Sequence, residues 1–218
     1  GAVIDLAGDA TIDESVLRDI LGAAGVVAHR GDSRLRPELV AEPLVDAETD
    51  LAGTTHLVTG ALGGVGSVLA DHIARAGGSL AVVTSSPLPP DDEHDAWLAT
   101  HALDDPTSRR IRRLRELRDA GGRVEVVVAD LDTAVGVQSA VHDAVAAFGS
   151  IDSILHAAGR LHDDLIATLD VEAARTVVEP KADASLRFHE AAAAAGIERL
   201  TLVSSSSTEL APIGQLTY

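Results

Sequence analysis

The chain of 218 residues contains no cysteine and no methionine, and only 2% of its residues are aromatic. Without cysteine it has neither a disulfide nor a thiolate site. With so few rings, its core must be filled by Val, Leu, Ile and Ala, within an apolar share of 46%. No run of about eighteen apolar residues and no basic-then-apolar leader is present. We therefore expect a soluble, cytoplasmic protein. Because the chain starts at Gly1 and not at Met, we also expect that it was cut from a longer polypeptide or trimmed.

Positive charge is scarce and unevenly distributed. The chain carries 17 basic against 34 acidic residues, a formal net charge of −17, which argues against nucleic acid as a partner. Six arginines nevertheless crowd one short segment: Arg109, Arg110, Arg112, Arg113, Arg115 and Arg118. On a helix they would spread over more than one face, so we interpret them first as a solvated helix surface.

From Thr54 onward, short apolar runs alternate with longer segments of helical period. Continuous apolar runs are typical of strands that are buried on both faces, so the fold class is α/β, a Rossmann-like doubly wound parallel sheet. A proline- and acid-rich connection is expected at 87–106. The expected strands are 55–59, 80–84, 124–129, 151–156 and 200–204, and the expected helices are 65–76, 108–120, 133–148 and 171–195.

The first 52 residues have a different pattern. Runs at 2–6 and 26–29 are typical of strands, and they flank an amphipathic helix at 13–21 with Thr11 or Asp13 as its N-cap. The segment 42–53, with its acids and a proline, has the composition of a linker. We therefore expect two parts, 1–52 and 53–218, and the first is too short to be a comfortable domain by itself.

A glycine-rich run, Thr59 to Gly66, lies between an expected strand and an expected helix. A dinucleotide pyrophosphate needs backbone N–H donors at a helix N-terminus and glycine where the phosphates come close, and the T-G-x3-G-x-G spacing provides both. The alternative is a tight turn without a ligand. Asp130, at a strand end, can accept a hydrogen bond from an adenine amino group, or it is an ordinary surface acid. The small residues 157–159 leave room for a nicotinamide ribose.

The single lysine and the single tyrosine are Lys181 and Tyr218, and Ser205 lies thirteen residues before the tyrosine. A phenol, a hydroxyl and an ammonium group near a dinucleotide loop form a proton-donating set for carbonyl reduction. The alternative reading is structural: Lys181 as a surface charge, Ser205 as part of a turn, and Tyr218 as a packed ring. His156, His162 and His189 lack ligand spacing, so we predict no metal site and interpret them as surface or packing histidines.

These motifs resemble those of the short-chain dehydrogenase/reductase superfamily, and most closely the ketoreductase domain of a polyketide synthase. Lys181 lies upstream of Ser205, as in that family, whereas free-standing reductases use Tyr-x3-Lys. The resemblance implies three catalytic residues, Lys181, Ser205 and Tyr218. The cofactor-binding residues that it implies are Thr59, Gly60, Leu62, Gly64, Val65, Gly66, Ser85, Ser86, Asp130, Leu131, Ala157, Ala158 and Gly159.

The activity that the resemblance implies is reduction of a β-ketoacyl thioester, carried by an acyl carrier protein, with NADPH as the cofactor. Neighbouring domains of the same synthase are further expected partners. Ketoreductases that form the D-hydroxyl product carry a Leu-Asp-Asp fingerprint; Asp163 matches its second acid, and His162 stands in place of the first. Ketoreductases of the opposite stereochemical class carry a Trp eight residues before the tyrosine, where this chain has Leu210. The resemblance therefore implies the D-hydroxyl product. The first 52 residues resemble the end of the family's structural subdomain, itself Rossmann-like.

The sequence departs from the family in two respects. Ser85 stands where an arginine of the family usually holds the 2′-phosphate of NADPH. Asp91 stands in place of a second such arginine and would repel that phosphate. The arginine-rich segment that begins at Arg109 could supply the missing positive charge. The chain also stops at Tyr218, before the expected Asn, lid and last strands, so the catalytic subdomain is expected to be incomplete. Two alternatives stay open: an inactive scaffold domain, or an NAD-dependent short-chain alcohol dehydrogenase or epimerase.

Overall fold

The computed structural model describes residues 2–8, 11–22, 25–38, 40–43, 50–165 and 167–207. The chain divides into two compact units, Gly1–Glu48 and Thr49–Tyr218. Among the described residues, no helix is long and apolar enough to cross a membrane.

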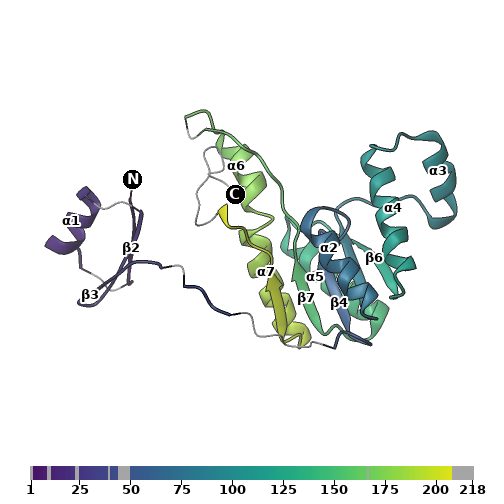
Figure 1. The fold of residues 1–218 in the computed structure, drawn as a ribbon, viewed down its shortest axis with the longest axis horizontal. Coiled ribbons are helices and arrows are strands. Elements are labelled where there is room, and N and C mark those ends of the chain that lie inside the picture. Colours follow the sequence, from purple (N-terminus) through teal and green to yellow (C-terminus); the bar gives the residue numbers. More distant parts are fainter. Residues whose placement is uncertain are drawn as a thin grey trace. The chain divides into compact units, whose positions relative to one another are not determined.

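The first unit is a small three-stranded sheet with one helix (Figure 1). Strand β1 (Ala2–Leu6) runs parallel to β2 (Gly25–Arg30), which pairs antiparallel with β3 (Ser33–Leu35). Helix α1 (Glu14–Gly22) begins after Asp13, whose Oδ1 accepts from the Val16 N–H at 3.0 Å, so the predicted N-cap is confirmed. Sequence patterning missed β3, because it is only three residues long and none of the three is buried.

The second unit is built on a five-stranded, entirely parallel sheet in the order β6-β5-β4-β7-β8. This order confirms the predicted Rossmann-like doubly wound sheet. The strands are β4 (Thr55–Thr59), β5 (Ser79–Thr84), β6 (Val124–Val128), β7 (Ser153–His156) and β8 (Arg199–Leu202). The main helices are α2 (Gly64–Arg75), α4 (Pro106–Asp119), α5 (Ala134–Phe148) and α7 (Ala182–Ala195).

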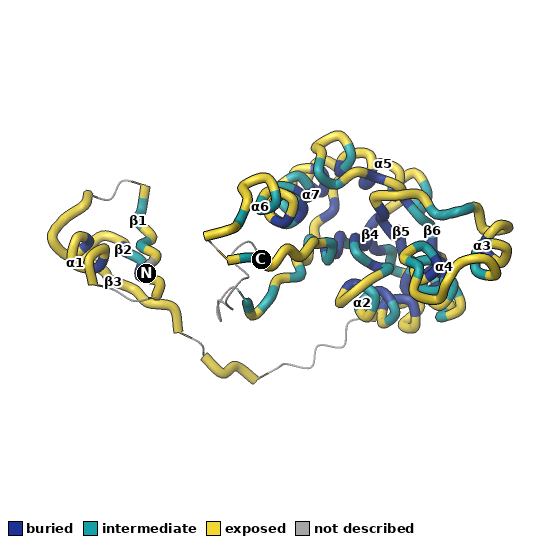
Figure 2. The backbone as a smooth tube through the Cα atoms, turned by 90° about the horizontal axis from the view of Figure 1, so that it is seen from above, coloured by how far each residue is buried: buried dark blue, intermediate teal, exposed yellow. Residues whose placement is uncertain are grey.

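Two hydrophobic clusters hold the layers together, one on each face of the sheet. Leu57 packs with α5 and α7, whereas the next residue, Val58, packs with α2 and α4, because successive strand residues point to opposite faces. Both side chains are fully buried, and Figure 2 shows the central strands as the buried part of this unit. This double burial explains why the strands are continuous apolar runs.

Two expected segments differ from the structure. The single helix expected at 171–195 is two helices, α6 (Val171–Val178) and α7, separated at Pro180, since proline lacks the N–H that a continuous helix needs. The connection 87–106 contains a 3₁₀ turn, η1 (Asp91–Glu93), and helix α3 (His94–Thr100). Its prolines and acids concealed this helix in the sequence.

The strand order determines where a ligand can bind. The chain proceeds from β4 outward through β5 to β6, and then crosses to β7 and β8 on the other side of β4. The connections after β4 and β7 therefore leave the sheet toward opposite faces. In open α/β sheets, ligands bind at this switch point, outside the carboxyl ends of the strands.

Candidate active site

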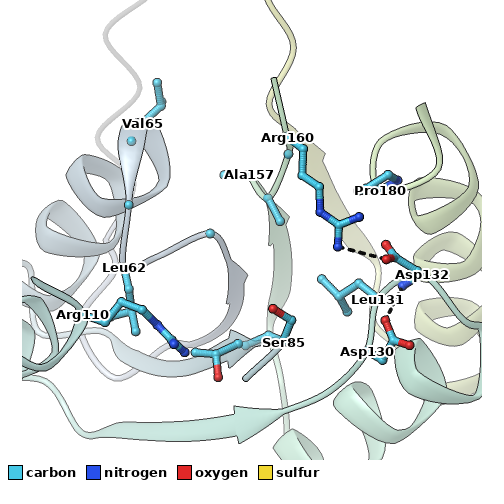
Figure 3. Close-up of a pocket in the computed structure, with 17 residues that line it drawn as sticks. Leu62, Val65, Ser85, Arg110, Asp130, Leu131, Asp132, Ala157, Arg160 and Pro180 are labelled. Atoms are coloured by element: carbon cyan, nitrogen blue, oxygen red, sulfur yellow. Dashed lines mark hydrogen bonds and ion pairs between the residues drawn. The ribbon is translucent and has the colours of Figure 1, made fainter. Parts of the chain in front are cut away.

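A cavity of about 470 Å³ lies at the switch point, along the carboxyl ends of β4, β5, β6 and β7. Figure 3 shows its walls. The lining residues are Gly60, Leu62, Gly63, Gly64, Val65, Val83, Thr84, Ser85, Arg110, Asp130, Leu131, Asp132, Ala157, Ala158, Gly159, Arg160 and Pro180.

The glycine loop forms one wall of the cavity, and two of its glycines, Gly60 and Gly66, have no space for a side chain. Gly60 has a φ of +73°, and a Cβ there would lie 2.8 Å from the backbone of Ala157 and Ala158. A Cβ at Gly66 would lie 2.4 Å from the carbonyl oxygen of Gly60. Helix α2 begins here, and its N-cap, Gly63, offers no side chain to cap the first turn. The first N–H groups of α2 and this bare loop fit a pyrophosphate.

Most of the predicted cofactor residues surround the cavity, and three lie just behind its wall. Thr59, Gly66 and Ser86 do not line it. The Thr59 Oγ1 accepts from the Ala158 N–H at 3.0 Å, Gly66 packs on Gly60, and the Ser86 carbonyl accepts from the Arg110 guanidinium at 2.6 Å. These three residues therefore shape the wall rather than form its surface.

Sequence reasoning did not single out two charged residues that face the cavity. Arg160 Nη2 and Asp132 Oδ2 are 2.9 Å apart, and this ion pair links the segment after β7 to the segment after β6 (Figure 3). The signal was available: Arg160 follows the predicted cofactor segment 157–159 directly, and Asp132 follows Leu131. Arg160 and Asp132 were overlooked because neither belongs to a cofactor-binding motif.

Arg110 is the residue of the arginine-rich segment that lines the cavity. It projects from α4 beside Ser85 and Leu62 (Figure 3). Burial lowers the pKa of Arg110, which nevertheless remains a cation at any physiological pH. The expectation of a purely solvated helix surface is therefore wrong for this position.

Asp91, which we expected to repel a cofactor phosphate, does not line the cavity. Its Oδ1 lies 2.9 Å from Arg118 Nη1, and the hydrogen bond from Arg118 lowers the pKa of Asp91. The carboxylate is thus paired with an arginine of α4, and its charge is offset at that point.

Lys181 lies at the start of α7, beside the cofactor segment. Its Nζ donates to the Val203 carbonyl at 3.1 Å, and its Cε occupies the space beside Gly159, where a Cβ would lie only 2.7 Å away. Burial lowers the pKa of the Lys181 ammonium group. Because Gly159 also lines the cavity, Lys181 lies at its edge.

The other predicted site residues are only partly covered by the structure. Ser205 follows Val203 by two residues, is half-buried, and its Oγ donates to Ser207 Oγ at 3.1 Å. Asp163 is exposed, on the segment after β7. Tyr218 and Leu210 lie outside the described residues. In the described part of the chain, no group of three or more His, Asp or Glu side chains is arranged to hold a metal ion.

His156 is a packing histidine, one of the two readings that we expected, and not a surface residue. It is 1% exposed at the end of β7, and both of its ring nitrogens are hydrogen-bonded. Nδ1 lies 2.7 Å from Thr59 Oγ1, and Nε2 lies 2.7 Å from the carbonyl oxygen of Pro180.

The contact between Gly159 and Lys181 gives a testable prediction. A Gly159→Ala substitution should displace the lysine and lower kcat for ketone reduction about 10-fold or more, because misplacing a reacting group by about 1 Å can cost about 10²-fold. Steady-state kinetics of the full-length protein measure this. Gly22→Ala is the control, since its new Cβ meets no atom within 4 Å. Equal kcat in both variants would show that Gly159 makes no room for a catalytic group.

The fold and cavity define a dinucleotide-binding domain of the short-chain dehydrogenase/reductase type. Comparison with known proteins gives the family: a family model described as the KR domain matches residues 54–218. The chain belongs to this family, the ketoreductase domains of polyketide synthases, whose members are oxidoreductases that use a nicotinamide cofactor.

One relative belongs to the phenolphthiocerol/phthiocerol polyketide synthase of Mycobacterium tuberculosis. It is 31% identical over 228 residues, which cover 100% of this chain and 12% of that protein. The chain therefore spans about an eighth of the length of this relative.

Solved structures show the same fold. An N-terminal ketoreductase from the macrolactin assembly line matches with a TM-score of 0.70 at 19% identity, covering 100% of this chain and 41% of that one. An NADH-dependent reductase, A1-R′, responsible for alginate metabolism, matches with a TM-score of 0.59 at 22% identity, covering 78% of this chain and 65% of that one.

Proposed function

We propose that this domain reduces a β-ketoacyl thioester to the D-β-hydroxyacyl thioester with NADPH, within a polyketide synthase. The observation that carries the proposal is the position of Lys181. The lysine contacts Gly159 in the wall of the dinucleotide cavity and Val203 two residues before Ser205. A cation at this point adjoins both the cofactor segment and a candidate carbonyl-binding hydroxyl.

Each residue has a distinct role in the proposed reaction. A nicotinamide cofactor held in the cavity would supply the hydride that the β-carbon of the ketone receives. Ser205 donates a hydrogen bond to the ketone oxygen and stabilises its developing charge. Tyr218 transfers its phenol proton to that oxygen. A free tyrosine has a pKa near about 10, and the positive charge of Lys181 lowers it toward the working pH.

The family supports the proposed partners, and the sequence fingerprint at Asp163 supports the proposed hand of the product. The polyketide synthase relative is far longer than this chain, which supports other domains of one synthase as partners and an acyl carrier protein as the carrier of the substrate. Asp163 is exposed on the segment that follows the cofactor residues 157–159, where an incoming acyl chain can meet it. We assign it to selection of the D-hydroxyl product.

Arg110 supports NADPH rather than NADH as the cofactor. It lines the cavity next to Ser85, at the end of the second strand of the dinucleotide fold (Figure 3). In such folds an arginine near this point accommodates the 2′-phosphate of NADP. Arg110 lies on α4, far along the chain from the usual family position, and would supply the charge that Ser85 lacks.

This assignment predicts the effect of removing the charge of Arg110. In Arg110→Gln, the Kd for NADPH should rise about 10- to 100-fold, since a hydrogen bond to a charged group contributes about 1.5–3 kcal/mol. The Kd for NADH should stay unchanged, because NADH has no 2′-phosphate. Isothermal titration with both cofactors measures this, and Arg109→Gln, an exposed neighbour outside the cavity lining, is the matched control. Equal losses for NADPH and NADH would contradict the assignment.

Titration of the unmodified full-length protein separates the proposal from its alternatives. Tighter binding of NADPH than of NADH supports the ketoreductase proposal. Binding of NADH alone would favour an NAD-dependent alcohol dehydrogenase or epimerase. Binding of neither would favour an inactive scaffold domain.

A further inference from the structure

His156 connects three segments at the end of the central sheet. Its ring lies between Thr59 at the end of β4 and Pro180 just before α7, and the Phe188 ring of α7 packs against it at 5.2 Å between centroids. Thr59 and His156 are both fully buried. Burying a polar side chain in this way destabilises the fold unless its hydrogen bonds are satisfied.

The partners of the ring determine its tautomer. The Pro180 carbonyl oxygen can only accept, so Nε2 carries the proton and donates to it. Nδ1 then accepts a hydrogen bond from the Thr59 hydroxyl group. The Thr59 Oγ1 in turn accepts a hydrogen bond from the Ala158 N–H. Burial lowers the pKa of His156, which keeps the ring neutral and this arrangement intact. The imidazole therefore spans a fixed distance from β4 to the residue before Lys181.

A second connection runs through the backbone of the same residue. The His156 carbonyl accepts from the Val203 N–H at 3.0 Å, and the Val203 carbonyl accepts from Lys181 Nζ at 3.1 Å. The side chain of His156 thus holds the peptide unit that leads into Lys181, and its backbone holds the acceptor of the ammonium group. His156 therefore holds both the backbone and the ammonium group of Lys181 in place.

We propose that His156 is a positioning residue that sets the location of the Lys181 ammonium group beside the cofactor segment. Its importance for turnover rests on the proposed ketoreductase function. A purely structural histidine would fill space between β7 and α7. A positioning histidine must instead keep the bond from Nε2 to Pro180, because that bond fixes the start of the helix that carries the lysine.

Two amide variants separate these roles, because each copies one ring nitrogen. In His156→Gln the amide reaches the position of Nε2 and keeps a donor for Pro180; in His156→Asn it reaches only the position of Nδ1 and Thr59. In the full-length protein, we expect His156→Asn to lower kcat for β-ketoacyl thioester reduction by about 10- to 100-fold, the scale of a misplaced catalytic group. His156→Gln should stay near the wild-type kcat. Equal kcat losses in both variants would overturn the proposal.

A double-mutant cycle with Lys181→Ala tests whether His156 acts through the lysine. If it does, His156→Asn causes no further loss of kcat in the Lys181→Ala protein. An equal loss in both backgrounds would assign His156 to general packing and overturn the proposal. If His156→Asn lacks a cooperative thermal transition, His156→Gln alone tests the proposal, because it keeps the donor for the Pro180 carbonyl. A kcat lowered about 10-fold or more in His156→Gln would then overturn the proposal.

A readout that does not need turnover keeps this inference separate from the proposed function. Lys181 is the single lysine of the 218 residues, so one peptide of this segment reports on it. An amine-reactive acylating reagent modifies the neutral amine, and mass spectrometry of that peptide over a range of pH gives the pKa of Lys181. We expect that pKa to rise toward its ordinary value of 10.5 in His156→Asn and to stay unchanged in His156→Gln. A rise in a protein that reduces no thioester would disprove the function and retain the positioning role. An unchanged pKa in an active protein would disprove the positioning role.

Discussion

Replacing Tyr218 by Phe in the full-length protein is expected to remove most ketone reduction and to leave cofactor affinity unchanged. The phenol proton is used only in the chemical step, so the change should appear in kcat, with a loss of about 10²- to 10⁴-fold typical of a missing general acid. Tyr218 is the single tyrosine of the chain, so no neighbouring phenol within these residues can replace it. Steady-state kinetics with a β-keto thioester measure the loss.

The control for this experiment is the Kd for NADPH, measured on the same variant by isothermal titration. Phe keeps the ring and removes one oxygen, so the Kd should equal that of the wild type. Turnover like that of the wild type would refute the assignment of Tyr218 as the proton donor. A raised Kd with unchanged kcat would place this residue in cofactor binding instead.

Gly66→Ala is expected to weaken binding at the dinucleotide site, because the added Cβ has no space. The added Cβ would lie 2.4 Å from the carbonyl oxygen and 2.8 Å from the carbonyl carbon of Gly60, so the loop must move. Overpacking of this kind costs about 1–3 kcal/mol, which corresponds to a rise of about 10- to 100-fold in the Kd for NADPH. Isothermal titration of the full-length variant measures it.

Val68→Ile is the matched control for the glycine variant. It also adds one carbon to α2, but at a side chain that is 65% exposed and outside the cavity lining. Its Kd should equal that of the wild type. If Gly66→Ala bound NADPH as tightly as Val68→Ile does, the glycine loop would not be the pyrophosphate site.

Local patterns predicted the sheet well because its central strands are buried on both faces. The expected strand at 55–59 has the observed bounds, since a short run rich in β-branched residues and followed directly by Gly60 leaves few alternatives. The helix expected at 171–195 was wrong at Pro180, where a known helix breaker was given too little weight. Strand β3 is three exposed residues and carries no hydrophobic signal of its own.

The candidate site was predictable where a motif is continuous and was missed where the contacts span the chain. The glycine loop lies within eight residues and was found. His156, by contrast, meets Thr59 across 97 positions and Pro180 across 24, and its spacing to them has no sequence signature. Arg110 was one of six clustered arginines, and only the packing of α4 shows which of them faces the cavity.

The proposed ketoreductase function is tested by a reduction assay on the full-length protein with a β-ketoacyl thioester and either NADPH or NADH. We expect NADPH to be consumed in proportion to the alcohol formed, NADH to support much slower turnover, and chiral chromatography to find the D-β-hydroxyacyl product. A folded protein that binds NADPH but forms no alcohol would contradict the central claim, and a predominantly L-configured alcohol would contradict the role assigned to Asp163.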